Sequence, residues 1–215
     1  MSWQVAHHLE PAGTFHARAV PATPERAAWV CAATAPALVL GSAQHDDRVD
    51  RAACAAAGIE VVRRRSGGGA VLVVPGEVLW VDLIVPAGDA LWQDDVGRAF
   101  HWVGEVWAAA LEELGVAAEV HRGALVRSPW SAAVCFAGLG PGEVTVAGRK
   151  VVGISQRRTR AGARFQCAAL GRWDPEAIVP LLGLPPAALV DLQDVAAPVG
   201  VALDALLTPL VRHLP

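Results

Sequence analysis

The apolar positions along the chain predict many short strands and a few helices. Apolar side chains recur at helical spacing over residues 93–115, where Phe100, Val103, Trp107 and Leu111 fall on one face and Asp94 or Asp95 can cap the start. Short apolar runs bounded by glycine, proline or aspartate predict strands near 36–44, 59–65, 116–121, 132–137, 142–147, 149–157 and 163–170, and further helices at 47–58, 174–182 and 201–213. This order lacks strict strand–helix alternation, so it predicts an α+β fold with a mixed, largely antiparallel β-sheet flanked by helices.

A longer β-rich run, "VLVVPGEVLWVDLIVP", covers residues 71–86. The dipeptide Pro75-Gly76 interrupts it as a turn would. We therefore expect a hairpin whose strands lie near 70–74 and 77–85.

Length and composition limit the class of protein. The 215 residues are 53% hydrophobic and 18% charged, which indicates a globular chain, and no repeat or long linker divides it. We expect a single domain over residues 1–215 without an accessory C-terminal domain. A net charge of −3 and the lack of a basic stripe argue against nucleic-acid binding. No signal sequence and no apolar run of bilayer length are evident, which predicts a cytoplasmic protein without membrane contact.

The four cysteines form no close pair, so neither a metal site nor a redox dithiol is indicated. Cys31 and Cys54 lie in alanine-rich stretches expected to be helical, where a free thiol behaves as a small buried hydrophobe. Cys135 lies in the apolar segment 132–137, which is predicted to be a strand.

Lys150 is the only lysine in a chain with seventeen arginines. It follows a predicted hairpin turn at Ala147-Gly148, where a solvated lysine would be unremarkable on position alone. A compact ammonium with a tunable pKa is, however, something that arginine does not supply. A chemical role and a solvated turn residue are both compatible with the position.

Three successive glycines follow the predicted strand 59–65. Gly67, Gly68 and Gly69 permit positive φ and leave no side chain between the backbone N–H groups and a ligand. An ordinary flexible turn is the alternative.

In this order, the segments resemble the catalytic domain of the biotin/lipoate protein ligase family (class II), on its lipoate–protein ligase A and octanoyltransferase side. The resemblance runs from about residue 36 to 182. Its residues are Gly41 and Gln44, then Arg64, Arg65, Ser66, Gly67, Gly68, Gly69 and Val71, then Gly148, Lys150, Gly153 and Arg158.

The resemblance implies transfer of an octanoyl or lipoyl group to the lysine of a lipoyl carrier domain. Lys150 would stabilise the acyl carbonyl as negative charge develops there. Cys135, fifteen residues earlier, would carry the acyl group as a thioester, as in one transferase branch, with Lys150 as the partner of its thiolate. The implied substrate-binding residues are Arg65, Ser66, Gly67, Gly68, Gly69, Gly41, Gln44 and Gly153, and no metal ligand or cofactor is implied for a transferase.

Three alternatives remain open. The same family contains ligases that use ATP and Mg to activate free lipoate. Val73 and Val74 stand where the family usually has His-Asp, and the segment "FQCAAL" around Cys167 lacks the usual histidine, which favours a non-catalytic acyl-binding or scaffold protein. A biotin ligase is a weaker alternative, based on the segment "PGEVLW".

The implied partners are an acyl carrier protein as donor and a lipoyl domain or glycine-cleavage H-type protein as acceptor. Such carriers are typically acidic. Seven arginines lie near the two motifs and would form a basic rim that steers them: Arg63, Arg64, Arg65, Arg157, Arg158, Arg160 and Arg164.

Overall fold

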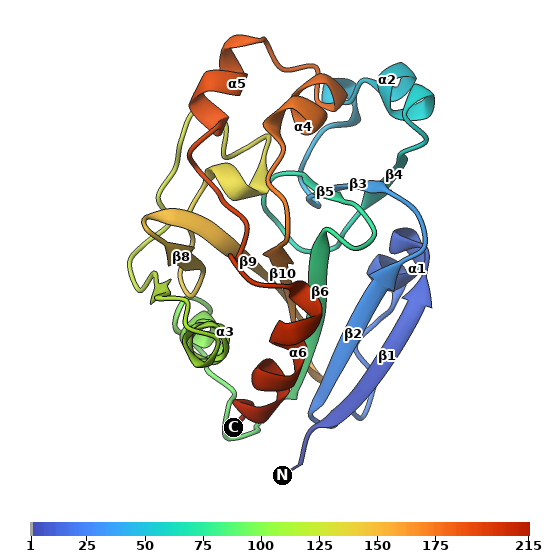
Figure 1. Cartoon of the computed structure of the whole chain (residues 1–215). Helices are drawn as coiled ribbons and strands as arrows, with labels where there is room; N and C mark the ends of the chain where they lie inside the picture. The colour runs from blue at the N-terminus through green and yellow to red at the C-terminus, as the bar shows by residue number, and fades with distance from the viewer. Residues whose placement is uncertain (1) are drawn as a thin grey trace.

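A large seven-stranded sheet forms the centre of the computed structural model, which describes residues 2–215 (Figure 1). Only the outer pair β1 and β2 is parallel in it, and the other neighbours are antiparallel. In spatial order its strands are β1 (Gln4–Glu10), β2 (Ala27–Ala33), β6 (Val78–Pro86), β10 (Gly162–Leu170), β9 (Arg149–Arg158), β8 (Val144–Val146) and β7 (Glu119–Val120).

A smaller sheet of three strands stands beside one face of the large one. Its order is β4 (Glu60–Arg63), β3 (Ala37–Leu40) and β5 (Val71–Val73), with β3 parallel to β4 and antiparallel to β5. Its outer side packs against α2 (Arg51–Ala56), α4 (Pro175–Leu181) and α5 (Ala187–Leu192). These helices are grouped at one end of the molecule (Figure 1).

Helices α3 (His101–Glu113) and α6 (Leu203–Arg212) cover the opposite face of the large sheet. Trp107 and Leu111 of α3 are fully buried against that face, as their helical spacing predicts. Leu206 and Leu210 of α6 complete this core. Burial of such side chains contributes about 1.5–3 kcal/mol each, so this layer holds the sheet rigid behind the site.

The space between the two sheets is closed by the short helix α1 (Ala12–Ala17). Phe15 of α1 is buried against Trp80 of β6, and their rings make an edge contact with centroids 5.2 Å apart. The cavity described below lies in this layer.

The predicted α+β class with a mixed, largely antiparallel sheet is confirmed. The expected hairpin over 70–85 is wrong, because β5 pairs with β3 in the small sheet whereas β6 pairs with β2 and β10 in the large one. Pro75-Gly76 is a turn, and Gly76 has φ +79°, but it connects two sheets rather than two paired strands.

Two further predictions are wrong. Residues 132–137 are not a strand, because Cys135–Ala137 form a short 3₁₀ turn, η3, after an isolated bridge between Val134 and Ala70. Cys31 lies in strand β2 rather than in a helix, although it is buried as expected. An alanine-rich segment can form a helix or a strand. Here its pairing with β1 and β6 makes the segment a strand.

Candidate active site

The glycine loop and the segment around Cys135 are held together by their backbones. Ala70 N–H donates to Ala133 O (2.7 Å), and Cys135 N–H donates to Ala70 O (2.9 Å). A side chain at Gly69 would place its Cβ 2.6 Å from Cys135 N, closer than atoms can approach. Glycine at this position therefore lets the loop lie directly against the cysteine segment.

Gly41 and Gln44 support the same contact from the small sheet. A Cβ on Gly41 would lie 1.9 Å from Gly68 O, so glycine is required there too. The Gln44 side chain accepts from Gly41 N–H at 2.8 Å and donates to Ala133 O at 2.9 Å. These bonds tie the end of β3 to the cysteine segment.

Cys135 is the one cysteine of the four that is only half-buried. Burial raises the pKa of the other three thiols, Cys31, Cys54 and Cys167, so these stay protonated at neutral pH. The Nη2 atom of Arg64 lies 3.8 Å from Cys135 Sγ. The Arg64 guanidinium thus places a positive charge beside a sulfur that solvent can reach.

Arg64 is held rigidly in this position. Its side chain is buried and donates to Gly67 O at 2.8 Å and to Gly69 O at 2.8 Å. The same guanidinium therefore fixes the glycine loop and faces the cysteine. Three carbonyl groups surround it, the third being Val39 O at 3.4 Å.

Lys150 is buried rather than solvated. Its ammonium lies 2.7 Å from Glu143 Oε2 and donates to Cys135 O and Gly138 O, both at 3.0 Å. These three acceptors match the three donor hydrogens of an ammonium. The Glu143 carboxylate in turn accepts from Gly140 N–H (2.6 Å) and Ile154 N–H (3.1 Å).

The position of Lys150 revises one expectation. Its ammonium bonds the backbone carbonyl of Cys135, and the cation beside the sulfur is Arg64. The turn at Ala147 and Gly148 is present as predicted, with φ +48° and +75°. The solvated-residue interpretation of Lys150 is wrong, since β9 directs the side chain into the protein interior.

An apolar cavity of about 50 Å³ lies between the two sheets, with Cys135 in its wall. Its lining is mostly hydrophobic: Val39, Val71, Val73, Val78, Trp80, Phe136, Ile154 and Ala168, with Gly153 and Cys167. That volume is enough for a few water-sized groups. An eight-carbon chain therefore needs one wall to move, and Phe136 also borders a neighbouring hollow of about 30 Å³.

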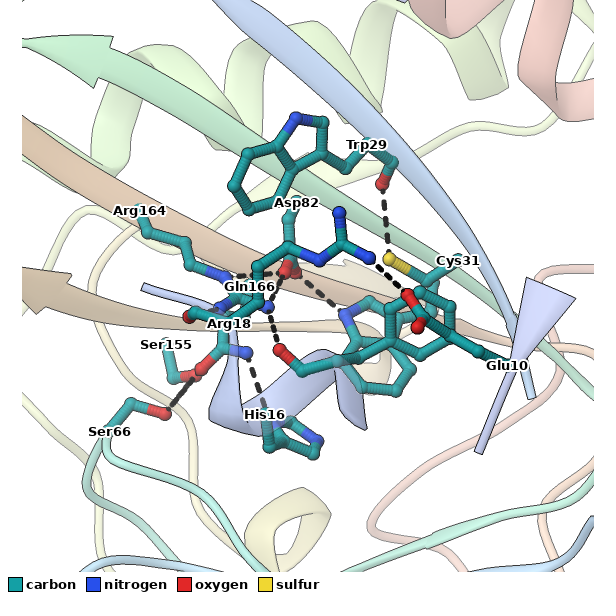
Figure 2. Close-up of polar contacts among 12 residues, drawn as sticks. Glu10, His16, Arg18, Trp29, Cys31, Ser66, Asp82, Ser155, Arg164 and Gln166 are labelled. Atoms are coloured by element: carbon teal, nitrogen blue, oxygen red, sulfur yellow. Dashed lines mark hydrogen bonds and ion pairs between the residues drawn. The ribbon is translucent and has the colours of Figure 1, made fainter. Parts of the chain in front are cut away.

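Several polar side chains in the wall of this cavity are joined by hydrogen bonds, which Figure 2 draws. Ser66 Oγ donates to Gln166 Oε1 (2.9 Å) and lies 3.0 Å from Ser155 Oγ. Gln166 Nε2 lies 3.1 Å from Nδ1 of His16, which is carried by α1. His16, Ser155 and Gln166 all line the cavity, so the wall is not wholly hydrocarbon.

The sequence matches a family model, the lipoyl protein ligase A/B catalytic domain, over residues 16–195. The chain belongs to this family. It is therefore an enzyme of the lipoate ligase and acyltransferase group, as the motifs predict. No curated protein matches the chain in sequence.

Solved structures with the same fold include several lipoate ligases. The chain is similar to protein Ta0514 of T. acidophilum, solved with bound lipoic acid, at 17% identity and a TM-score of 0.73, covering 99% of this chain and 84% of that one. A lipoate-protein ligase A bound with ATP is 17% identical with a TM-score of 0.75, and the match covers 99% of this chain and 84% of that one. A bi-partite lipoate protein ligase from Thermoplasma acidophilum, studied with its E2 lipoyl domain, is 17% identical with a TM-score of 0.75. That match covers 99% of this chain and 82% of the other.

The structure brings most of the predicted site residues of this lipoyl ligase family member together. Gly153 lines the cavity, and Ser66 is buried beside it. Gly67 and Gly68 form the exposed tip of the loop, and Gly68 has φ +99°. Arg65 is the exception, because alternation along the chain points it to solvent and places Arg64 inside. Cys167 also lines the cavity.

The basic rim is smaller than the sequence suggests. Arg164 is buried in an ion pair with Asp82, and Arg64 is buried beside Cys135. Arg158 packs over the ring of Trp92. The arginines that stay exposed near the loop and β9 are Arg65, Arg157 and Arg160, with Arg63 paired to Asp46.

Sequence reasoning missed His16, Gln166 and Ser155 altogether. Nothing in their spacing brings α1, β9 and β10 to one wall, and only the register that aligns Gln166 with Ser155 does so. Among residues 2–215, no three His, Cys, Asp or Glu side chains gather where they could share a metal ion. Within the same residues, every helix is too short or too polar to cross a bilayer.

Proposed function

We propose that this enzyme transfers an octanoyl or lipoyl group to the lysine of a lipoyl carrier domain through a thioester on Cys135. The observation that carries this proposal is the place of Cys135: a half-buried thiol in the wall of an apolar cavity, with a guanidinium 3.8 Å from its sulfur. Once one wall moves, an acyl chain could lie in the cavity with its carbonyl at the thiol.

The reaction has two balanced steps. In the first, the Cys135 thiolate attacks the thioester carbonyl of an acyl carrier protein, a new C–S bond forms, and the carrier thiolate leaves and takes up a proton. In the second, the neutral amine of the acceptor lysine attacks the Cys135 thioester. An amide forms, the amine loses a proton, and the Cys135 thiol is restored.

Arg64 and Lys150 have separate tasks in this scheme. Arg64 stabilises negative charge on sulfur before attack and after release. Lys150 fixes the cysteine segment through Cys135 O and Gly138 O. For Lys150 to stabilise the acyl carbonyl directly, its ammonium must give up one of these two hydrogen bonds. The bond to Gly138 O can be given up while the bond to Cys135 O is kept.

The proposed partners are an acyl carrier protein as donor and a lipoyl domain or glycine-cleavage H-type protein as acceptor. Exposed Arg65, Arg157 and Arg160 supply positive charge beside the glycine loop and β9. Charge of this sign raises the association rate of acidic carriers and loses its effect as salt shortens the screening length.

One assay tests the function. An apo lipoyl domain is incubated with octanoyl-acyl carrier protein, or with free octanoate, ATP and Mg²⁺, and its mass is measured. Acylation from the carrier-bound donor, lost in Cys135→Ser and kept in the buried-thiol control Cys54→Ala, supports the proposal. Acylation only with ATP, retained in Cys135→Ser, would identify a ligase. Ligand-induced stabilisation without product in either arm would indicate an acyl-binding protein.

A further inference from the structure

His16 is one of the few polar groups in a cavity wall that is mostly hydrocarbon. It is carried by α1, is 7% exposed, and stacks on Trp80 with ring centroids 4.5 Å apart. Arg164 holds α1 in place by donating to Phe15 O (2.8 Å), one residue before His16, and to Arg18 O (2.5 Å), two residues after it. The same guanidinium forms an ion pair with the buried carboxylate of Asp82 (Figure 2). The imidazole is therefore fixed in position.

The hydrogen bonds around Gln166 determine which ring nitrogen carries the proton. Gln166 Oε1 accepts from Ser66 Oγ, so the other terminal atom of this amide is its nitrogen. An amide nitrogen donates hydrogen bonds and accepts none. The same nitrogen lies 3.1 Å from His16 Nδ1, which is thus an acceptor. The ring proton lies on Nε2.

This imidazole is neutral at physiological pH. Burial, followed by the charges of Arg164 and Arg64, lowers the pKa of His16 to about 3. Among residues 2–215, Nδ1 makes the one hydrogen bond of this side chain. Nε2 is not among the buried polar atoms that lack a partner, so this nitrogen borders open space. Because His16 lines the cavity, its Nε2–H is a donor available to whatever occupies that space.

We infer that His16 is a specificity-determining residue, whose Nε2–H selects acyl chains that carry a hydrogen-bond acceptor, such as a hydroxyl or keto oxygen or a dithiolane sulfur. This inference rests on the proposed acyl transfer. A plain hydrocarbon chain would cover the donor and leave it without a partner, which disfavours binding, whereas an acceptor on the chain would satisfy it. Sites built to hydrogen-bond a substrate group reject analogues that lack it.

The test is a series of octanoyl-acyl carrier protein donors that carry one hydroxyl at carbons 3 to 8 in turn. For the wild type, we expect kcat/KM at one or two adjacent positions to exceed that of plain octanoyl by about tenfold. His16→Phe, which keeps an aromatic ring on Trp80 but removes the donor, should abolish the preference. His8→Phe is the matched control, because His8 contacts Phe15 outside the cavity, and it should keep the preference.

Each result bears on the inference. A flat wild-type profile across the series would overturn it, and this measurement needs no variant. A preference that survives in His16→Phe would overturn it as well. If no donor is transferred, the proposed function fails, and calorimetry with the free hydroxyoctanoic acids and octanoic acid then decides. Tighter binding of one hydroxy acid, lost in His16→Phe, would support a selecting donor in an acyl-binding protein; equal binding would refute it.

Discussion

Removal of the Lys150 ammonium should unfold the protein far more readily than removal of a surface charge. The exposed fractions of the Lys150 and Glu143 side chains are 2% and 6%, and their charged atoms lie 2.7 Å apart. Lys150→Met keeps the length of the side chain but leaves the Glu143 carboxylate buried without a cation. Breaking a buried pair on one side costs about 3–5 kcal/mol. The loss of bonds to Cys135 O and Gly138 O acts in the same direction.

The assay is urea unfolding of the wild type, Lys150→Met, Glu143→Gln and the double variant. We expect the double variant to lose at least about 2 kcal/mol less than the sum of the single losses, because neither charge is then left alone. For a chain of this size, Lys150→Met should lower the Tm by roughly 6–20 °C. Arg149→Met, at the exposed neighbouring position, is the control and should change stability little.

Two results would refute this reasoning. A loss below about 1 kcal/mol in Lys150→Met would mean that the ammonium is solvated in solution. Additive losses in the cycle would mean that Lys150 and Glu143 do not interact. Either outcome would mean that the Lys150 ammonium is free to contact the substrate.

Three further predictions concern the same site. Arg64→Gln should slow alkylation of Cys135 by iodoacetamide about tenfold at pH 7, because the cation beside the sulfur is lost, whereas Arg149→Gln should not; equal rates would remove Arg64 from the thiol environment. Gly69→Ala should cost about 2 kcal/mol or more of unfolding free energy because its Cβ would lie 2.6 Å from Cys135 N, and an unchanged urea midpoint would contradict that close approach. The folded protein keeps His16 neutral with a pKa near 3, whereas the unfolded chain takes up a proton near pH 6.5, so stability falls as the pH drops through this window. Between pH 7 and pH 5 the wild type should lose about 2 kcal/mol more than His16→Phe in urea unfolding, and parallel losses would show that His16 is not buried neutral.

Much of the fold and both motifs could be predicted from the sequence, because they depend on local rules. Turn chemistry predicted the Ala147-Gly148 turn, and helical spacing predicted the buried face of α3 with Trp107 and Leu111. The three successive glycines were predicted to open backbone N–H groups to a ligand, and the structure adds a different reason for glycine, since Gly41 and Gly69 lie directly against other backbone segments. These features are visible from a few neighbouring residues.

The remaining features depend on contacts between distant segments. The apolar run around Cys135 matches a strand, but its backbone bonds to Ala70 leave only an isolated bridge and a 3₁₀ turn. The sequence alone does not say which of two adjacent arginines is buried. The direction of the chain after β4 places the Arg64 side chain inside the protein and the Arg65 side chain in solvent. His16 reaches the cavity only because Arg164, about 150 residues later in the chain, fixes α1.

The central claim is that Cys135 carries the acyl group, and an intact-mass measurement tests it most directly. Wild-type protein and Cys135→Ser are each incubated with octanoyl-acyl carrier protein without an acceptor, quenched in acid and weighed. We predict one octanoyl adduct on the wild type that hydroxylamine removes, and none on Cys135→Ser. An adduct that persists in Cys135→Ser, or no adduct on the wild type while the acceptor is still acylated, would contradict the account.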